Sequence, residues 1–371
     1  MSSVFSPTRP LDASFRTTIA RTLDNFVDDR AGDLSAIDTS LRCVAEAARS
    51  IAVSGKHIRP AFAWWGRVAV DADVPDADCL LRAVASLDLL HAGLLVHDDL
   101  IDGADTRRGE PAAHVRFAAE HREAAHSVGD ANTYGQGGAV LVGALLMEWS
   151  TALFDSAGLQ PVRLAAARPL LARMRQEVLA GQLLDLRAQH GLAVGTQTDA
   201  VRARLDAAEQ IVRYKTALYT VARPLQLGAI LGGSDADLVE ELGHFGIPLG
   251  RAYQWRDDLL DVFGDASVTG KPVGQDLRDG KPTLLVAEAL AHADGASTHA
   301  LCDVLGKVDA SDAEIETARQ ILVDTGARER VEHAIARDYA AALRQLDDLP
   351  ITPDGRTALA ELARQCVERD R

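Results

Sequence analysis

Apolar residues recur at intervals of three and four positions along almost the whole chain of 371 residues. The strict alternation of apolar and polar residues that marks a half-buried β-strand is missing, so the pattern predicts an all-α protein. Several periodic segments are apolar on more than one face and are expected to lie inside a multi-helix bundle. Helices are predicted over residues 12–30, 36–52, 59–70, 77–101, 136–155, 161–190, 201–231, 236–264, 282–293, 311–341 and 354–369.

Short breakers separate the predicted helices, and no change in composition marks a linker between domains. Residues 1–371 are therefore expected to form one all-α domain, with a motif-bearing core at about residues 51–285. One segment does not fit the helical pattern. Residues 121–138 are rich in His, Gly, Asn and Ala and show little periodicity, so they are predicted to form a loop, either over the site or at the edge of a dimer.

The bulk composition excludes some classes of protein. A formal net charge of −15 argues against sequence-independent nucleic-acid binding, which depends on a basic surface. The four cysteines (43, 79, 302 and 366) have no C-x-x-C spacing and are expected to be ordinary thiols. No uninterrupted apolar stretch approaches the roughly 20 residues of a membrane span, and the N-terminus has no apolar signal core. A cytoplasmic protein without a transmembrane segment is expected.

Two acidic clusters with the spacing D-D-x-x-D stand at the ends of predicted apolar helices. They consist of Asp98, Asp99 and Asp102, and of Asp257, Asp258 and Asp261. In a helix the first and last Asp of each cluster point the same way, so the carboxylates repel one another unless cations are present. Oxygen ligands of this kind suit Mg²⁺ together with water and phosphate oxygens. One cluster alone is more simply a solvated helix end, but two at identical spacing predict a metal-dependent clamp for a diphosphate.

Basic residues accompany these clusters. They lie in the stretches 54–60, 105–111, 214–216 and 269–281, three of which contain glycine. Guanidinium and ammonium groups beside Gly-containing loops hold phosphate oxygens that no metal holds. Each stretch alone is more simply a set of exposed basic side chains. With the paired acidic clusters they predict a site for two diphosphates, one bound through metal and the other bound directly.

Six motifs follow one another along the chain. They are G-K-x-x-R-P at 55–60, H-x6-DDxxD-x4-RRG-x-P at 91–111, GQ-x-x-D at 181–185, Y-K-T-x-x-Y at 214–219, Q-x-x-DDxxD at 254–261 and GK-x-x-x-DL-x-x-GK at 270–281. In this order they resemble the trans-isoprenyl diphosphate (polyprenyl) synthases, most closely the actinobacterial geranylgeranyl diphosphate synthases. The resemblance implies an isoprenoid synthase-type bundle of ten or more helices around a central cavity, and a homodimer.

The resemblance also implies an activity, the condensation of isopentenyl diphosphate with allylic diphosphates of the C5–C15 range. In this family the allylic diphosphate ionises to a carbocation, the double bond of isopentenyl diphosphate attacks it, and the departing diphosphate is thought to take the proton. Mg²⁺ assists the departure of the leaving group, and about three ions per site are implied by the resemblance.

By resemblance, each motif residue has a role. Asp98, Asp102 and Asp257 would bind the metal directly, and Asp99, Asp258 and Asp261 directly or through water. The allylic diphosphate would be held by Arg107, Lys215 and Lys271, and isopentenyl diphosphate by Lys56, Arg59, His91 and Arg108. Thr216, Tyr219 and Gln182 would line the developing cation, where oxygen dipoles favour positive charge. Asp185, Gln254, Asp276 and Lys281 would support these side chains.

Two positions depart from the family pattern. His57 stands where most relatives carry arginine, which is expected to soften one diphosphate contact, and Ala144 stands where aspartate is common. Two motif residues also have simpler interpretations: His91 as a packed core histidine and Lys215 as a lysine on a helix surface.

Product length is expected to depend on the residues four, five and eight positions before Asp98, namely Leu94, Gly93 and Leu90, which by resemblance face the tunnel into which the product grows. Gly93 is expected to leave space and Leu94 to block only part of it. The floor would then lie deeper, at Leu90 or beyond. The expected main product is geranylgeranyl diphosphate (C20) with some C15, and a C25–C50 product is the alternative.

Two other classes of protein stay open. A terpene cyclase would usually replace the second acidic cluster and would not need a second diphosphate site. A non-catalytic regulatory subunit of a heteromeric synthase would normally lose one acidic cluster or the basic set. This chain has both acidic clusters and all the basic stretches, so a synthase is preferred.

Overall fold

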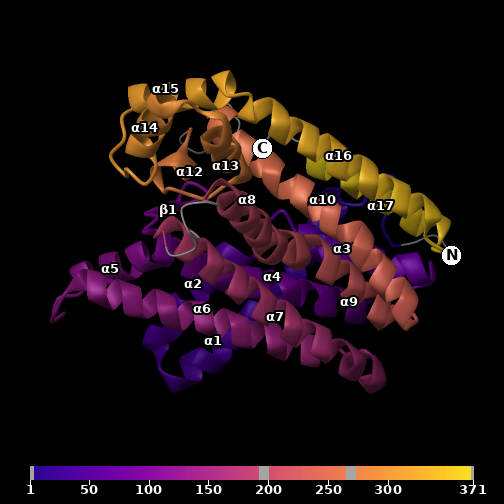
Figure 1. Ribbon diagram of the computed structural model, residues 1–371. Helices are drawn as coiled ribbons and strands as arrows, with labels where there is room; N and C mark the ends of the chain where they lie inside the picture. Colours follow the sequence, from indigo (N-terminus) through magenta and orange to yellow (C-terminus); the bar gives the residue numbers. More distant parts are fainter. Residues whose placement is uncertain (1–3, 192–199, 265–272, 369–371) are drawn as a thin grey trace.

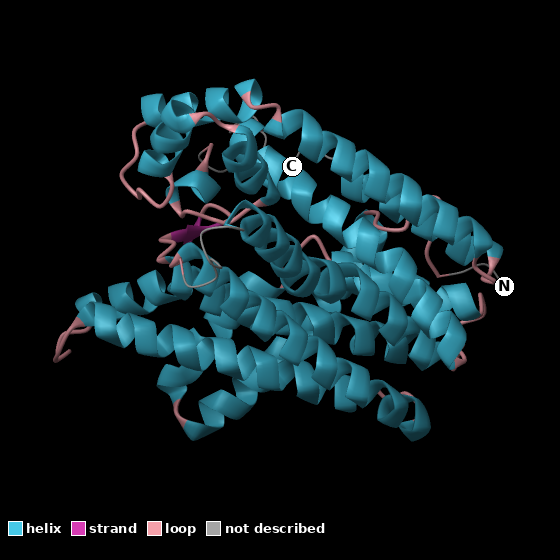
Figure 2. Cartoon of the chain, in the orientation of Figure 1, coloured by secondary structure: helices cyan, strands magenta, loops and turns pink. Residues whose placement is uncertain are grey.

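The computed structural model describes residues 4–191, 200–264 and 273–368. Figure 1 and Figure 2 show that helices make up nearly all of this part of the chain. The strands in these ranges form a single antiparallel pair, in which β1 (Thr106–Arg107) lies beside β2 (Glu110–Pro111). The prediction of an all-α fold of ten or more helices is therefore confirmed.

The helical elements have the following bounds. In chain order they are α1 (Ala13–Ile37), η1 (Thr39–Leu41), α2 (Arg42–Ala52), α3 (Ile58–Val70), α4 (Ala77–Asp102), α5 (Ala113–Glu123), α6 (Ala131–Asp155), α7 (Pro161–Gln189), α8 (Ala200–Ile211), η3 (Val212–Ala222), α9 (Arg223–Gly232), α10 (Ala236–Phe263), α12 (Gln275–Arg278), α13 (Leu284–His292), α14 (Gly295–Val304), α15 (Asp312–Asp324), α16 (Ala327–Asp348) and α17 (Pro353–Val367). Side-chain caps start many of them; Asp12, for example, accepts a hydrogen bond from the backbone N–H of Phe15 at 3.0 Å.

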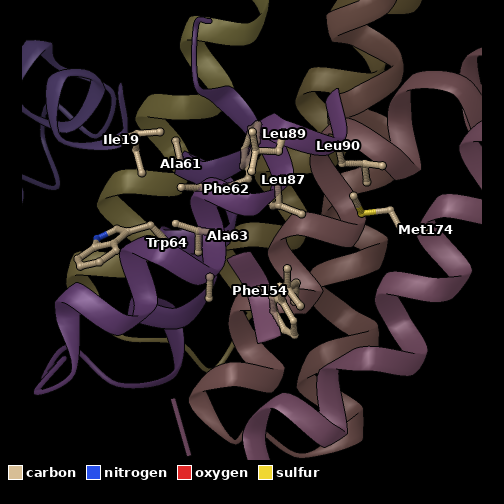
Figure 3. Close-up of a cluster of buried hydrophobic side chains, with 14 of the residues drawn as sticks. Ile19, Ala61, Phe62, Ala63, Trp64, Leu87, Leu89, Leu90, Phe154 and Met174 are labelled. Carbon is tan, nitrogen blue, oxygen red and sulfur yellow. The ribbon is translucent and has the colours of Figure 1, made fainter. Parts of the chain in front are cut away.

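The hydrophobic core is centred on α3 and α4, whose residues are buried on nearly all sides. Figure 3 shows part of it: Phe62 and Trp64 of α3 and Leu87 of α4 belong to one cluster with Phe154 of α6 and Met174 of α7. This burial explains why both helices are apolar on more than one face. Because the middle of α4 is buried, charged side chains come together at its end and at the ends of the neighbouring helices.

The predicted loop at residues 121–138 is wrong for most of its length. α5 ends at Glu123 and α6 begins at Ala131, so the connection spans only residues 124–130. Asp130 caps α6 by accepting a 2.7 Å hydrogen bond from the backbone N–H of Thr133. The glycines that hid the helical pattern allow close packing instead: a β-carbon at Gly138 would lie 2.6 Å from Cγ of Phe117 in α5.

Other predicted boundaries also change. The single helix predicted over 311–341 is two helices, because Gly326 adopts a left-handed backbone (φ 73°) between α15 and α16. The helix predicted over 201–231 is continuous, but its middle part, η3, is π-helical. Helices α5, α12 and α14 were not predicted.

Two helices, α4 and α6, are long and apolar enough to cross a membrane by length and composition alone. In α4, 72% of the apolar window is buried inside the protein, as in a core helix; in α6 the share is 44%. The four cysteines are free thiols, as expected.

Candidate active site

The two acidic clusters stand in the last turns of α4 and α10. α4 ends at Asp102, and α10 ends two residues after Asp261. Both helices are buried along much of their length, so their ends carry carboxylates to the edge of the core; Asp99 and Asp258 are themselves buried. In Figure 1 the labels β1 and α12 lie in one part of the bundle, and hydrogen bonds link these two elements to the acidic helix ends.

Arg107 and Lys281 contact the first acidic cluster. Arg107 of β1 donates from Nε to Asp99 Oδ1 at 2.6 Å, and its Nη2 lies 3.6 Å from Asp98. Lys281 Nζ donates to Asp102 Oδ2 at 2.6 Å, although the two residues are far apart in the sequence. These cations offset the mutual repulsion of the carboxylates. The structure therefore brings the two predicted basic residues to the first cluster.

Asp98 has partners from two further elements. Gln182 of α7 donates from Nε2 to Asp98 Oδ1 at 2.9 Å, and Lys215 of η3 approaches the same oxygen at 3.4 Å. Lys215 Nζ lies closer to Asp185 Oδ2, at 2.6 Å, and Asp185 is only 3% exposed. Lys281 Nζ is 4.0 Å from that same carboxylate. Asp185 thus holds both lysines beside the first cluster.

The π-helical segment η3 also reaches the second cluster. Thr216 Oγ1 donates to Gln254 Oε1 at 2.7 Å, and Gln254 Nε2 donates to Asp258 Oδ1 at 2.7 Å. Since the preceding residue, Lys215, faces Asp98, one segment joins the two acidic clusters. Widened helical turns of this kind occur often at functional sites because they change the direction of neighbouring side chains.

The end of α10 is anchored to α12. Asp261 Oδ2 accepts a 2.9 Å hydrogen bond from the backbone N–H of Asp276, and the Asp261 carbonyl accepts one from Gly274 at 2.8 Å. Asp276, predicted to support the site, is therefore part of it. Lys271, predicted to bind the allylic diphosphate, lies outside the described residues.

The second cluster concentrates negative charge in a buried place. Burial raises the pKa of Asp258 to about 8; the hydrogen bond from Gln254 opposes the shift, and the charges of Asp257 and Asp261 add to it. Burial and the nearby Asp261 likewise raise the pKa of Asp276 well above its ordinary value. A proton or a bound cation lowers such repulsion, so the cluster favours cation binding.

In the first cluster, basic groups compensate the charge of Asp98. Burial alone would raise the pKa of Asp98, but the charges of Lys215, Lys281 and Arg107 outweigh it, so its pKa is lowered. Burial raises the pKa of Asp102, helped by Asp98 and opposed by Lys281. The two clusters therefore differ electrostatically although their sequences match.

The carboxylates suit a divalent cation that shares its coordination with a ligand. Within residues 4–191, 200–264 and 273–368, no three His, Cys, Asp or Glu side chains form a group that could hold a metal ion unaided. Mg²⁺ is commonly bound by one or two carboxylates together with water and substrate phosphate oxygens. The i,i+4 pairs Asp98 with Asp102 and Asp257 with Asp261 fit this mode, so the residues present fit the predicted ion.

Two of the four residues predicted to bind isopentenyl diphosphate, Arg59 and His91, lie beside Tyr219. Arg59 of α3 lies over the Tyr219 ring at 4.4 Å and donates to Thr220 Oγ1 at 2.8 Å. The His91 ring lies 6.2 Å from the Tyr219 ring. Burial, then the charge of Arg59 and those of the adjacent arginines, lowers the pKa of His91 well below its ordinary value, so the ring is neutral near pH 7.

Three further features complete this group. Arg108 donates to Ser54 Oγ at 3.0 Å, and Lys56 is exposed in the loop before α3. Burial raises the pKa of Tyr219, which therefore remains a neutral hydroxyl. That buried hydroxyl has no hydrogen-bond partner in the part of the chain that the structure describes.

The residues predicted to set product length lie on α4. Leu90 is fully buried in the core (Figure 3), and Leu94 is half-buried. The prediction that Gly93 leaves open space is wrong. A β-carbon there would lie 2.7 Å from the carbonyl oxygen of Gly143 and 2.9 Å from Cγ of Met147. Helix α6 fills the space beside Gly93. The roles of Leu90 and Leu94 in product length stay predictions.

Sequence reasoning missed two contacts near the site. His57 is buried against Asp88, so its ring is engaged inside the protein, and the expected softening of a diphosphate contact stays a prediction. His97 fits into a notch of α6 that Gly143 leaves open. A lone aspartate in the apolar run 87–90 was the available signal for the first contact, but its partner is 31 residues away.

Known proteins share this arrangement over nearly the whole chain. The family model of polyprenyl synthetase matches residues 42–322. The geranylgeranyl pyrophosphate synthase of Corynebacterium glutamicum, solved in complex with isoprenyl diphosphate and magnesium, is 36% identical, with a TM-score of 0.89 over 97% of this chain and 99% of that one.

Curated relatives agree with this match. The short chain isoprenyl diphosphate synthase of Methanothermobacter thermautotrophicus is 30% identical over 95% of this chain and 98% of its own. The nonaprenyl diphosphate synthase of Mycobacterium tuberculosis is 29% identical over 85% of this chain and 83% of its own. The predicted resemblance is confirmed, and the chain belongs to the polyprenyl synthetase family of trans-prenyltransferases.

Proposed function

We propose that this trans-prenyltransferase condenses isopentenyl diphosphate with allylic diphosphates to give mainly geranylgeranyl diphosphate (C20). The observation that carries the proposal is the linkage of both acidic clusters through one segment: Lys215 contacts Asp98, and Thr216 bonds Gln254, which in turn bonds Asp258. This linkage supports one site in which carboxylates would bind a cation and ammonium groups would bind phosphate oxygens. The name of the Corynebacterium relative supports the C20 product.

The allylic diphosphate would be bound at the acidic clusters. Mg²⁺ held by Asp98, Asp102 and Asp257, with Asp99, Asp258 and Asp261 beside them, would supply Lewis-acid assistance to the leaving diphosphate. Arg107 and Lys215 would turn from their carboxylate partners toward the phosphate oxygens, as charged donors do. Lys271 would contribute similarly.

Oxygen atoms would stabilise the allylic cation. Thr216 uses its hydroxyl hydrogen on Gln254, which leaves the oxygen lone pairs available. The amide of Gln182 donates from its nitrogen to Asp98, so its carbonyl oxygen can face another way. With the neutral Tyr219 hydroxyl, these dipoles would favour positive charge beside them.

The second substrate, isopentenyl diphosphate, would be bound by Lys56, Arg59 and Arg108 beside the neutral ring of His91. Arg59 and His91 lie beside Tyr219, which is one of the residues proposed to stabilise the cation. No protein base is proposed, because the departing diphosphate would accept the proton.

Product length is the less constrained part of the proposal. Relatives are named for products that range from short chains to nonaprenyl diphosphate. A C20 product is supported by the full burial of Leu90, two helical turns or about 12 Å before Asp98 along α4. A C25–C50 product is the alternative.

The chain would act as one domain and as a homodimer. Exposed apolar side chains on α6, such as Leu141 (71% exposed) and Val140, support a second copy of the chain as the partner. Light scattering of the purified protein would measure the mass; a monomer at micromolar concentration would contradict the dimer.

A turnover assay tests the function. Labelled isopentenyl diphosphate and Mg²⁺ are supplied with C5, C10 or C15 allylic starters, and the products are sized by chromatography. C20 from every starter is expected, and chelation by EDTA should abolish it. A longer ladder would refute the C20 assignment, and no elongation in the presence of Mg²⁺ would point to a regulatory subunit.

A further inference from the structure

Two non-glycine residues in the described ranges have a left-handed backbone: His57 (φ 57°) and Arg108 (φ 55°). This conformation is costly for a residue that has a β-carbon, so it persists only where surrounding contacts hold it. Both residues lie in the loops that carry the proposed isopentenyl diphosphate ligands. The loops are joined, because Arg108 donates to Ser54 Oγ at 3.0 Å.

A buried pair anchors the first of these loops to α4. His57 Nδ1 donates a 2.6 Å hydrogen bond to Asp88 Oδ2, and the two residues are only 4% and 5% exposed. The loop backbone lies against the ring: a β-carbon at Gly55 would be 3.4 Å from Nδ1. The pair therefore fixes the turn from which α3 begins, and with it the residues on either side of His57.

Asp88 also balances the positive charge of Arg59 and Arg108. Partial burial and the neighbouring Arg107 lower the pKa of Arg108, and the charge of Asp88 opposes this shift. Burial raises the pKa of Tyr219, and the charges of Arg59 and Asp88 act on it in opposite directions, so Asp88 lies within electrostatic range of the same buried hydroxyl as Arg59. A buried carboxylate in this position makes it less costly to hold two guanidinium groups close together before an anion arrives.

We propose that His57 and Asp88 are positioning residues for the diphosphate that is bound without metal. Their hydrogen bond holds the left-handed turn and so sets the directions in which Lys56 and Arg59 leave the loop. Neither residue touches the substrate. The inference rests on the proposed function, because it takes Lys56 and Arg59 as ligands of isopentenyl diphosphate.

Two substitutions at residue 57 separate the hydrogen bond from the backbone conformation. His57→Gly removes the ring but accepts a left-handed backbone without cost. His57→Asn keeps an N–H donor at about the position of Nδ1 and also tolerates this backbone. We expect the KM for isopentenyl diphosphate to rise about tenfold in His57→Gly and less than about threefold in His57→Asn. The KM for the allylic substrate should stay within about twofold in both.

A second position and a matched control complete the series. Asp88→Asn removes the buried charge at constant size and should raise the same KM. Asp338→Asn changes another buried carboxylate, which Arg251 binds at 2.7 Å between α10 and α16. This control should lower thermal stability and leave the ratio of the two KM values unchanged.

The outcomes distinguish this inference from the proposed function. Calorimetric binding of isopentenyl diphosphate to the full chain in EDTA needs no turnover and should weaken about tenfold in His57→Gly. Unchanged binding in that variant, or an equal rise of both KM values, would overturn the positioning role while elongation by the wild type stands. A wild type that neither binds isopentenyl diphosphate nor elongates would refute the proposed function itself.

Discussion

Gly93 of α4 and Gly143 of α6 approach so closely that a β-carbon at residue 93 would lie 2.7 Å from the carbonyl oxygen of Gly143. The obstacle is backbone, which cannot move aside as a flexible side chain can. Gly93 is thus a packing residue of the interface between α4 and α6. The first acidic cluster begins five residues further along α4, so this contact also fixes the position of that cluster relative to α6.

Replacing Gly93 by alanine should therefore destabilise the protein by about 1–3 kcal/mol, as overpacking does. Gly32→Ala is the matched control, because Gly32 lies on the exposed face of α1 and a β-carbon there would meet nothing within 4 Å. That change should stabilise the helix by about 0.5–1 kcal/mol. Urea unfolding measures the change in the free energy of unfolding for both variants. Equal stabilities of the two variants would show that α4 and α6 can separate at Gly93.

Leu90→Ala tests the floor of the product tunnel. If Leu90 closes the tunnel, its truncation should extend the product beyond C20. Leu89→Ala is the control: Leu89 is equally buried but points about 100° away around α4. Each variant should lose about 2–5 kcal/mol of stability. A longer product ladder from Leu90→Ala alone supports the floor, whereas identical products from both variants would place it elsewhere.

Long helices could be predicted from the sequence because their apolar pattern is uninterrupted and burial decides their packing. The predicted helices 77–101, 161–190 and 236–264 differ from α4, α7 and α10 by one residue at the C-terminus. The α5–α6 region could not be recognised, because its glycines serve a tertiary contact. The division at Gly326 was missed since the apolar pattern continues across it.

The residues of the site could be predicted from the motifs, but several of their contacts could not. Motif spacing placed Lys215 and Thr216 together, but the π-helical turn that directs one to Asp98 and the other to Gln254 leaves no signature in the spacing. The partner of His57 could not be foreseen, because it depends on how α3 packs against α4.

Gly143→Ala should disturb catalysis through His97. The added β-carbon would overlap the His97 ring, which lies 3.2 Å from the carbonyl oxygen of Val140 and directly precedes Asp98. We expect kcat to fall about tenfold or more, because small displacements of reacting groups are costly. The double variant Gly143→Ala/His97→Ala should recover much of the loss, since removing the ring restores room. Without recovery, the damage would lie in the helix contact rather than in His97.

Asp98→Ala and Asp257→Ala test the proposed metal ligands. Each should lower turnover by about a thousandfold, because several kcal/mol of leaving-group stabilisation would be lost. Circular dichroism should show an unchanged helical fold. Asp105→Asn, an exposed carboxylate in the loop after α4, is the control and should keep its activity. Near-normal turnover in either alanine variant would remove that residue from the metal site.

The buried carboxyl of Asp258 should make stability depend on pH. Burial raises its pKa to about 8 in the folded protein, whereas an unfolded aspartate titrates at about 3.9. Between these values the folded state holds a proton that the unfolded chain has lost, so the free energy of unfolding falls as pH rises from about 4 to about 8. The buried Asp276 acts in the same direction.

Thermal unfolding in EDTA between about pH 5 and pH 8.5 measures this effect. Asp258→Asn carries a neutral amide at every pH. Its stability should therefore decrease less steeply as pH rises, and the decrease that remains should come from Asp276. The melting temperature of the variant should exceed that of the wild type by roughly 2 °C or more at the alkaline end. Equal slopes for the two proteins would mean that Asp258 is ionised in the fold, and its charge would then have to be balanced by neighbours on α10 and α12.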